Sequence, residues 1–442
     1  MKFKNFFIFI FFSTNFLQLQ SQDTTIITND SEIIKKEWNL GILPALSYES
    51  DVGFRYGFIL NLFNFGDGSI YPDYKHSIYI EWSRTTKGNG INMITYDSKY
   101  LIPNIRLSIE ASLYTEKTLD FYGFNGYKSI YNSNFENEHS YDYISRVFYK
   151  IDRKLFKLRS DFYGNFRNNL KWHAGIEYFD IKIGSVDIEN LNKGKSLSEQ
   201  LPDTSLLYDK YLEWKIIPEN QANGGKTTLF KLGFIYDTRN NEPNPTKGIW
   251  TEFLILISQK PFSNYSYGRF CFTHRQYFNI TKNFALASRI SYQGKLYGVM
   301  PFYMLPFVYN TAPNFTRDGL GGSKTIRGIL RNRVVGEDFL YGNLESRWKI
   351  YRTVLLKQNF YVVYSIFTDF GMITRDYKID LTNVTVEEKE KYFSQNESLH
   401  VSYGTGLHIV MNQNFIVAFD YARSFKKQDG LDGLYINLNF LF

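Results

Sequence analysis

Hydrophobic and polar side chains alternate along most of this chain, from about residue 44 to the last residue. A period of two is typical of a β-strand with one apolar and one polar face, because successive side chains point to opposite sides. In a soluble sandwich the apolar face points into the core. In a membrane barrel it points to lipid, and charged residues line the lumen. The clearest alternating stretches are 104–114, 284–298 and 415–421.

The alternation predicts sixteen strands, and an even number is typical of bacterial single-chain barrels. We therefore predict an all-β fold, a 16-stranded antiparallel transmembrane β-barrel with a long extracellular loop that folds inward. The predicted strands are 52–63, 75–85, 90–98, 104–115, 142–152, 156–166, 169–186, 226–239, 247–260, 265–280, 284–298, 337–350, 358–370, 399–410, 414–424 and 432–442.

The lengths of the connections fit a barrel whose N-terminus lies in the periplasm, with one exception. The long connections 187–225, 299–336 and 371–398 then fall outside the cell, where barrel loops are long, and the short turn 240–246 falls inside. The connection 116–141 is long, yet this count puts it on the periplasmic side. Either the strand count is wrong before this segment, or the segment folds into the lumen.

Composition supports a membrane barrel over a helical membrane protein. Aromatic residues make up 18% of the chain, with 35 Tyr and 40 Phe, and barrels place aromatic girdles at both membrane interfaces. The mean hydropathy is −0.32. After the first 21 residues, no stretch approaches the roughly 18–20 consecutive apolar residues that a spanning helix needs.

The first 21 residues have the pattern of a secretory signal peptide. Lys2 and Lys4 form a charged start, the stretch from Phe6 to Phe12 is apolar, and cleavage is expected near Gln22. The alternative is a buried N-terminal helix. Export favours a protein of the bacterial cell outer membrane. The expected organisation is a signal peptide at 1–21, a short periplasmic segment at 22–43 and the barrel at 44–442.

The alternation at the end of the chain predicts a last strand that closes the barrel. Leu434, Ile436, Leu438, Phe440 and Phe442 form one apolar face that ends on an aromatic residue. We expect Phe440 and Phe442 to help this strand close the barrel against the first strand. An aromatic terminus also resembles the signal that outer-membrane proteins present to their insertion machinery.

Charge and reactive residues exclude several functions. The net charge of +7 comes from 51 basic and 44 acidic residues that are dispersed along the chain, which does not favour nucleic-acid binding. The single cysteine, Cys271, cannot form an internal disulfide or a zinc cluster and is predicted to be a strand residue. The six histidines show no metal-ligand spacing, and no catalytic Ser, His and acid arrangement stands out. We expect no metal, no cofactor and no enzymatic activity.

A glycine-rich run occurs in the predicted loop 299–336 and carries one arginine, Arg327. It is not a phosphate-binding loop, because it lacks the G-x-x-x-x-G-K-[ST] pattern before a helix. Gly321, Gly322 and Gly328 would allow tight or positive-φ conformations there.

Alternation puts Glu345 on the same face of its strand as Arg347 and Lys349, and puts Asp369 on the face opposite Ile366 and Thr368. Both carboxylates would then face the lumen from neighbouring strands. The arginine side chain offers five donors in a rigid fork that suits carboxylates, so Arg327 is expected to pair with one or both. The alternative is an exposed loop arginine.

Several segments together resemble the bacterial surface antigen family, the superfamily of outer-membrane barrels that includes BamA and TamA. The resemblance implies that Gly321–Gly328 is the inward loop with its Arg-Gly motif, and that Phe367–Gly371 is the F-x-D-x-G strand motif. Asp237–Asn241 with Pro245–Gly248 resembles the turn between the eighth and ninth strands, and Asn343–Arg347 fits the twelfth strand. The loop anchor implied in this way comprises Arg327, Gly328, Gly321, Gly322, Glu345, Asp369 and Gly371.

Two departures from the family pattern bear on function. Ile329 stands where an aromatic residue usually follows Arg-Gly. Family members that insert or secrete proteins carry POTRA domains of about 75 residues before the barrel, which residues 22–42 cannot hold. The chain therefore resembles a barrel-only member, and a separate periplasmic POTRA-like or chaperone partner is expected.

The resemblance implies a role in outer-membrane biogenesis, in which a polypeptide or lipid is inserted into or translocated across the membrane. The seam between strands 52–63 and 432–442 would offer edges to an incoming strand. The rival is a passive channel or structural barrel, and a weaker rival is an outer-membrane hydrolase. In the channel the lumen charges would set selectivity: Arg106, Glu110, Glu252, Arg289 and Lys295.

Overall fold

The computed structural model describes residues 34–49, 53–71, 73–242, 244–309, 317–355, 358–411 and 415–442. The predicted signal peptide at 1–21 and the first part of the predicted periplasmic segment lie outside the described residues. The described residues hold a barrel and its connections, with no POTRA domain among them.

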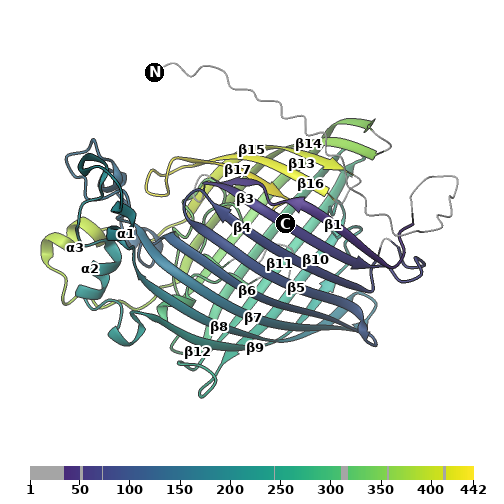
Figure 1. Cartoon of the computed structure of the whole chain (residues 1–442), viewed down its shortest axis with the longest axis horizontal. Helices are drawn as coiled ribbons and strands as arrows, with labels where there is room; N and C mark the ends of the chain where they lie inside the picture. The colour runs from purple at the N-terminus through teal and green to yellow at the C-terminus, as the bar shows by residue number, and fades with distance from the viewer. Residues whose placement is uncertain are drawn as a thin grey trace.

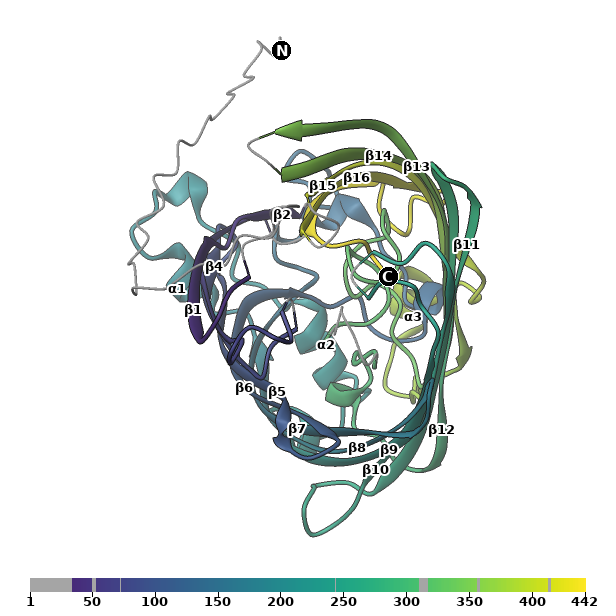
Figure 2. The same cartoon turned by 90° about the vertical axis from the view of Figure 1, so that its right-hand side faces the viewer.

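Antiparallel strands form a closed barrel (Figures 1 and 2). Each strand is paired with its neighbours in the chain, and the last strand returns to the first. The strands are β1 Trp38–Pro44, β2 Ser47–Glu49, β3 Gly53–Asn64, β4 His76–Thr85, β5 Asn89–Ile102, β6 Ile105–Asp120, β7 Lys150–Arg167, β8 Leu170–Ser185, β9 Gly224–Asp237, β10 Gly248–Ser258, β11 Tyr267–Thr281, β12 Phe284–Gly298, β13 Asp338–Leu355, β14 Gln358–Arg375, β15 His400–Met411, β16 Phe415–Ser424 and β17 Asp432–Leu438.

These seventeen segments make sixteen barrel strands, because β1 and β2 pair one after the other with β3. The backbone N–H of Ala45, between them, also donates to Gly57 of β3 at 3.0 Å. The predicted count of sixteen and the predicted fold class are therefore confirmed. The barrel begins at Trp38 and not at residue 44, so the predicted boundary was wrong.

A second error compensates for the missed first strand. The predicted strands 142–152 and 156–166 are not two strands, since β7 runs through Lys150–Arg167 and the preceding residues belong to a connection. Val147, Phe148 and Tyr149 are all buried, although successive side chains of a barrel strand point to opposite faces. This stretch is therefore packed on all sides and is not part of the barrel wall. Alternation alone could not separate such a stretch from a strand.

The corrected strand order places all the long connections at one end of the barrel. The connections that join β6 to β7, β8 to β9, β12 to β13 and β14 to β15 begin and end here, and we call this end the long-loop end. The other end, the short-turn end, has two-residue turns such as 103–104. The predicted misfit of 116–141 arose because the first strand was missed. With one strand too few, each connection from there to residue 141 was assigned to the wrong side of the membrane. The extra predicted strand 142–152 then restored the correct side for the later connections.

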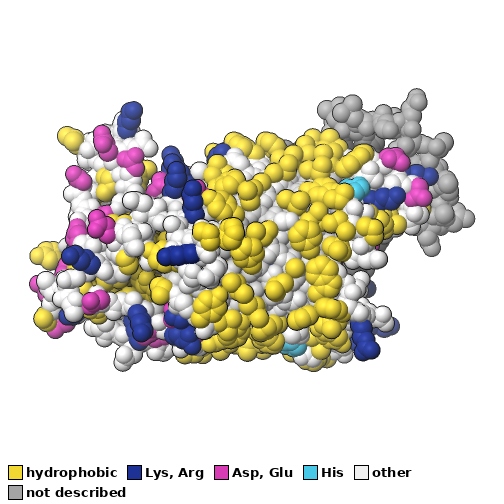
Figure 3. Space-filling model, turned by 90° about the horizontal axis from the view of Figure 1, so that it is seen from below, with side chains coloured by type: hydrophobic (Ala, Val, Ile, Leu, Met, Phe, Trp, Pro, Cys, Tyr) yellow, Lys and Arg dark blue, Asp and Glu magenta, His cyan; other side chains and the backbone are white. Residues whose placement is uncertain are grey.

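The outer wall of the barrel carries an apolar belt (Figure 3). Leu232 is 60% exposed and Ile366 is 58% exposed, while their strand neighbours alternate into the lumen. Charged side chains gather toward the ends of the molecule in this view. An apolar band between charged ends matches the lipid-facing surface of a membrane barrel. Among the described residues, no helix is long and apolar enough to cross a membrane.

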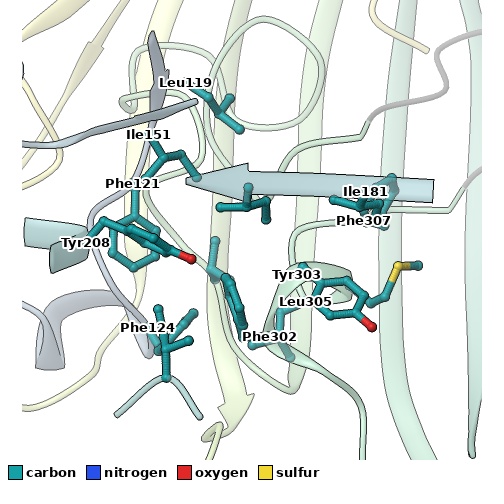
Figure 4. Packing of buried hydrophobic residues seen from close by; sticks show 14 of the residues in the cluster. Leu119, Phe121, Phe124, Ile151, Ile181, Tyr208, Phe302, Tyr303, Leu305 and Phe307 are labelled. Atoms are coloured by element: carbon teal, nitrogen blue, oxygen red, sulfur yellow. The ribbon is translucent and has the colours of Figure 1, made fainter. Parts of the chain in front are cut away.

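The long connections fold together into a cap that contains α1 Ile188–Asn192, α2 Leu207–Glu213 and α3 Val386–Phe393 (Figure 1). Phe121 makes edge-to-face contacts with Tyr208 and Tyr211, with ring centroids 5.6 and 5.3 Å apart. Phe302 from the 299–337 connection joins the same cluster beside Phe124 (Figure 4). Because aromatic residues from separate connections share one core, the cap holds these connections together.

Candidate functional site

Residues 317–337, which precede β13 and which we call the inward loop, enter the lumen and form a narrow hairpin there. Leu320 and Val334 exchange backbone hydrogen bonds of 3.0 and 3.1 Å, and the N–H of Gly322 donates to Ile329 at 2.8 Å. Gly321 and Gly322 have φ values of 115° and 75°, which L side chains rarely adopt. The glycines therefore let the chain reverse direction inside the barrel.

Arg327 lies at the tip of this hairpin and is 1% exposed. Its Nε and Nη2 donate to the two carboxylate oxygens of Asp369 at 2.9 and 3.1 Å, and its Nη1 donates to Glu345 at 2.9 Å and to Asp420 at 3.2 Å. The ring of Phe367 lies 3.3 Å from the guanidinium carbon. We call Arg327, Glu345, Asp369 and Asp420 the first ion cluster.

The first ion cluster carries one cation against three carboxylates from β13, β14 and β16. Burial lowers the pKa of the Arg327 guanidinium, but the attraction of Asp369, Asp420 and Glu345 outweighs it and raises the pKa above its ordinary value. Arg347 shares the excess negative charge, and His408 lies beside the third carboxylate. Arg347 donates to Glu345 at 2.8 Å, and a ring nitrogen of His408 lies 2.8 Å from Asp420.

The F-x-D-x-G motif has a physical explanation in this arrangement. Phe367, Asp369 and Gly371 alternate onto the lumenal face of β14. Phe367 supplies a ring under the guanidinium and Asp369 binds its fork. A Cβ on Gly371 would lie 2.6 Å from Ile326 of the inward loop, so glycine leaves the space that the loop occupies.

Gly328 is held as closely as Arg327. Its N–H donates to the hydroxyl of Tyr435 on β17 at 3.0 Å, and its φ is 81°. A Cβ there would lie 2.8 Å from backbone atoms of Ala422 and Arg423 on β16. Ile329, which stands where an aromatic residue was expected, is buried with Leu320 and other apolar residues of the inward loop.

Replacement of Gly328 by valine is expected to lower the temperature at which the barrel loses heat-modifiable gel mobility. The new side chain meets backbone and requires a φ that β-branched residues avoid, a cost of about 1–3 kcal/mol. Gly184→Ala is the control, because its Cβ would meet no atom within 4 Å. An equal effect of the two substitutions would contradict this account.

The structure brings together most of the residues that the sequence singled out for the loop anchor. Arg327 lies against Glu345 and Asp369, Gly328 against β16, and Gly371 against the loop. Asp420 was not among the residues predicted from the sequence. Its signal was present, because Asp420 is the carboxylate on the lumenal face of the alternating stretch 415–421.

The inward loop has a second ionic attachment, on β6 and β7. Arg153 of β7 donates through Nε to Glu116 of β6 at 2.8 Å and through Nη2 to Asp318 of the loop at 3.1 Å. Arg331 of the loop donates to the same two carboxylates, at 2.7 Å to Glu116 and 2.9 Å to Asp318. Arg317 adds a contact of 3.2 Å to Glu116. These five residues form the second ion cluster.

The two clusters lie on opposite sides of the barrel. In a ring of sixteen strands, β6 and β7 are about half the circumference away from β14 to β16, as Figure 2 shows. The inward loop therefore crosses the lumen and is attached at both ends. Arg333, two residues beyond Arg331, ties this end of the loop to the other connections by donating to backbone carbonyls of Gly126, Ser129 and Gln428 at 2.8–3.0 Å.

The last residues of the chain leave the barrel wall, contrary to the predicted closing strand. β17 ends at Leu438, and Asn439 has a φ of 70°, which turns the chain inward. Phe440 and Phe442 are each 3% exposed. Arg347 stacks on Phe440 at 4.0 Å and donates to the Phe442 carbonyl at 2.8 Å. The two aromatic residues therefore occupy the lumen and do not extend the lipid-facing face of Leu434 and Leu438.

The turn between β9 and β10 also folds inward at the short-turn end. Arg239 binds Asp237 with contacts of 2.9 and 2.8 Å and stacks on Trp250 at 4.1 Å. The side-chain amide of Asn244 donates to the hydroxyl of Tyr361 on β14. This turn and the end of the chain thus narrow the mouth of the barrel.

The barrel closes at a seam with little strand pairing. In the described part of the chain, two residue pairs join the first and last strands, Tyr48 with Ile436 and Glu49 with Tyr435. β16 and β17 share seven pairs by comparison. No register pair joins β1 to β17 within the described residues. The seam is therefore β1 and β2 against β17, and the predicted seam with 52–63 was wrong by one strand.

A cavity of about 990 Å³ occupies the part of the lumen that the inward loop leaves open. It lies along the inner faces of β3 to β9, where Arg106 and Glu110 line it as predicted, and it reaches the turn residues Asn104 and Glu242 at the short-turn end. It also reaches both sides of the seam, at residues 45–47 and 437–439.

The cysteine and one further histidine are buried in contacts with neighbouring residues. Cys271 is buried in β11. A ring nitrogen of His400 lies 2.6 Å from Asp429, and the His400 ring stacks on Tyr127. No group of three or more His, Cys, Asp or Glu side chains within the described ranges has the geometry of a metal site.

Comparison with known families identifies this arrangement. The model of the Omp85 superfamily domain matches residues 84–442. The chain belongs to the Omp85 superfamily. The inward loop and both ion clusters of this Omp85 barrel fall within the matched residues. The match begins in β4, so β1, β2 and β3 are defined by the structure and not by the family model.

Solved structures resemble the Omp85 barrel in fold. BamA from Haemophilus ducreyi lacking POTRA domains 1–3 has 15% sequence identity and a TM-score of 0.54, with 92% of this chain and 71% of that chain covered. CdiB from Escherichia coli has 10% identity and a TM-score of 0.52, with 90% and 63% covered. The chain thus spans less than two thirds of the length of CdiB. No curated protein sequence matches the chain significantly.

Proposed function

We propose that this Omp85 barrel acts in outer-membrane biogenesis, by helping a polypeptide or a lipid to enter or cross the membrane at its seam. The observation that carries the proposal is the seam itself, where two residue pairs close the barrel in the part of the chain that the structure describes. Each strand pair that is missing lowers the cost of separating the edges, and exposed edges can accept an added strand. Tyr48, Ile436 and their partners are the contacts that opening would break.

The occupied lumen favours a closed barrel over a passive channel. The inward loop crosses the lumen, and the cap of aromatic residues lies over its long-loop end. Two of the lumenal residues that a channel would use for selectivity are engaged in contacts inside the barrel. Arg289 donates to Asn343 at 2.8 Å, and Lys295 lies 2.5 Å from Glu337 at the base of the loop.

We place the protein in the bacterial outer membrane, with the long-loop end outside the cell and the short-turn end in the periplasm. This orientation follows from the loop lengths that bacterial barrels share. The insertion machinery of the outer membrane would assemble it, and outer-membrane lipid would surround its apolar belt. A separate POTRA-like or chaperone protein would deliver substrates from the periplasm. No catalytic step is assigned.

A disulfide across the seam is expected to abolish the function in cells. The variant combines Tyr48→Cys with Ile436→Cys, which are register partners, in a Cys271→Ser background. Locked protein should reach the outer membrane, while the cell becomes as sensitive to large antibiotics as a strain that lacks the protein. A reducing agent should restore resistance, because it frees the edges.

The control is a disulfide within the wall. Leu60→Cys with Ile80→Cys joins register partners of β3 and β4, which are not expected to separate. If the locked seam leaves antibiotic resistance and the level of outer-membrane proteins unchanged, the barrel works closed and the proposal fails. If both disulfides have the same effect, the crosslink acts on folding and not on the seam.

A further inference from the structure

We infer that the lumenal side of the seam is a binding site for the headgroup of an anionic lipid. The inference rests on the proposed function, since it names the class of substrate that the seam would handle. It starts from the cavity of about 990 Å³, whose lining includes residues on both edges of the seam. A molecule that occupies this cavity at the seam can remain in contact with the surrounding lipid.

The lining of the cavity carries nine Lys or Arg and five Asp or Glu side chains. Most of these charges are paired within the wall. Asp97 accepts from Arg106 at 3.0 Å, and Glu110 lies 2.6 Å from Lys157. Three further lining cations contact carboxylates outside the lining: Lys99 with Asp73, Arg159 with Asp161 and Arg317 with Glu116. A preference of the cavity for an anion therefore depends on the cations at the seam.

Two of the cations flank the seam on its lumenal side. Lys324 is carried there by the inward loop, and its Nζ lies 3.4 Å from the side-chain oxygen of Asn437 on β17. Arg55 of β3 is in register with Ser47 of β2, on the other edge of the seam. Its contact with Glu81 is 3.4 Å long and its side chain is 21% exposed. Lys324 and Arg55 line the same cavity.

Leucine side chains are exposed along the seam. Leu434 of β17 is 45% exposed and does not line the cavity, while Leu46 and Leu438 are 49% and 41% exposed and also border the cavity. Acyl chains can therefore pack outside while a charged group passes between the edges. A cation pair and exposed leucines at the same seam match the two ends of an anionic lipid. A free polypeptide strand would need neither cation.

The test measures the lipid that the whole chain retains after purification from vesicles. The vesicles contain phosphatidylcholine with or without phosphatidylglycerol, and native mass spectrometry counts the bound lipid. The wild type should retain phosphatidylglycerol and little phosphatidylcholine. Arg55→Gln with Lys324→Gln should lower retained phosphatidylglycerol roughly fivefold, the size expected for loss of partly exposed charge contacts.

The control is Lys171→Gln, which removes a cation from the same cavity on β8, away from the seam. It should retain phosphatidylglycerol as the wild type does, and all variants should keep heat-modifiable mobility. Equal retention of both lipids, or an equal loss in the control, would overturn the site. Displacement by soluble glycerol phosphate as strong as by lipid would also overturn it, because the site would then select a free anion.

A locked seam separates this inference from the proposed function. The Tyr48→Cys, Ile436→Cys disulfide formed before exposure to vesicles should prevent lipid loading if the headgroup enters between the edges. Loss of antibiotic resistance in locked cells with no selective lipid binding would mean that the seam works on another substrate. Selective binding with no phenotype of the lock would overturn the proposed function and leave the lipid site standing.

Discussion

Replacement of Arg327 by alanine is expected to lower the free energy of unfolding by about 3–5 kcal/mol, the cost of leaving buried charges without their partner. The substitution removes one cation from three carboxylates, of which Glu345 and Asp369 are fully buried. It also removes the bidentate contact that orients the tip of the inward loop. The measurement is the temperature at which heat-modifiable gel mobility is lost, together with the protein level in the membrane.

Two variants make the result specific. Arg352→Ala removes an exposed arginine of β13 whose contact is a 3.2 Å hydrogen bond to Asn283, so it should change little. Arg327→Lys keeps the charge but cannot bind both oxygens of Asp369 as a fork, so an intermediate effect is expected. If Arg327→Ala unfolds at the same temperature as Arg352→Ala, the first ion cluster does not stabilise the loop.

Most of the fold could be predicted, because every strand of a barrel wall alternates between side chains that face the lipid and side chains that face the lumen. Period-two alternation depends on neighbours in sequence, and it located β9 to β16 within a few residues of their observed ends. The first strand was missed because β1 is seven residues long, follows a polar segment and ends at Pro44. Its Trp38, Leu40 and Ile42 do alternate and are exposed on the outer wall, but three positions are too few to distinguish a strand from chance.

The end of the chain shows where alternation misleads. Phe440 and Phe442 continue the spacing of Leu434 and Leu438, yet they lie inside the barrel. One positive φ at Asn439 changes the direction of the chain, and asparagine tolerates that region better than most residues. The spacing of apolar residues indicates which side chains avoid water. It does not distinguish side chains that face lipid from side chains that are packed inside the lumen, because both are shielded from water.

The two ion clusters differ in how far the sequence could reveal them. The first lies on neighbouring strands that alternation and the family resemblance both located, so Glu345 and Asp369 could be named. The second depends on the register of Glu116 with Arg153 across β6 and β7. The predicted strand 104–115 ended one residue before Glu116, and Arg153 fell between the predicted strands 142–152 and 156–166, so the prediction did not place the two side chains opposite each other.

Replacement of Glu116 by alanine is therefore the sharper test of how the inward loop works. Glu116 is 1% exposed and accepts from Arg153, Arg317 and Arg331. Its loss leaves two buried arginines, Arg153 and Arg331, and the partly buried Arg317 with Asp318 as the remaining carboxylate of the cluster. We expect a loss of about 3 kcal/mol. Since Arg327 still holds the other end, the loop should swing from β6 and β7 and open a path through the cavity. Steady currents in planar bilayers, larger than those of the wild type, would record that opening.

Glu189→Ala is the matched control, because it removes an exposed glutamate from α1 in the cap. The variant that lacks both Glu116 and Arg327 decides whether the loop acts as one unit. If it does, the first substitution already frees part of the loop, and the two losses of stability should sum to more than the loss in the double variant. Strict additivity would mean that each cluster stabilises only its own side of the wall. Increased current without loss of stability would mean that Glu116 gates the lumen and does not support the fold.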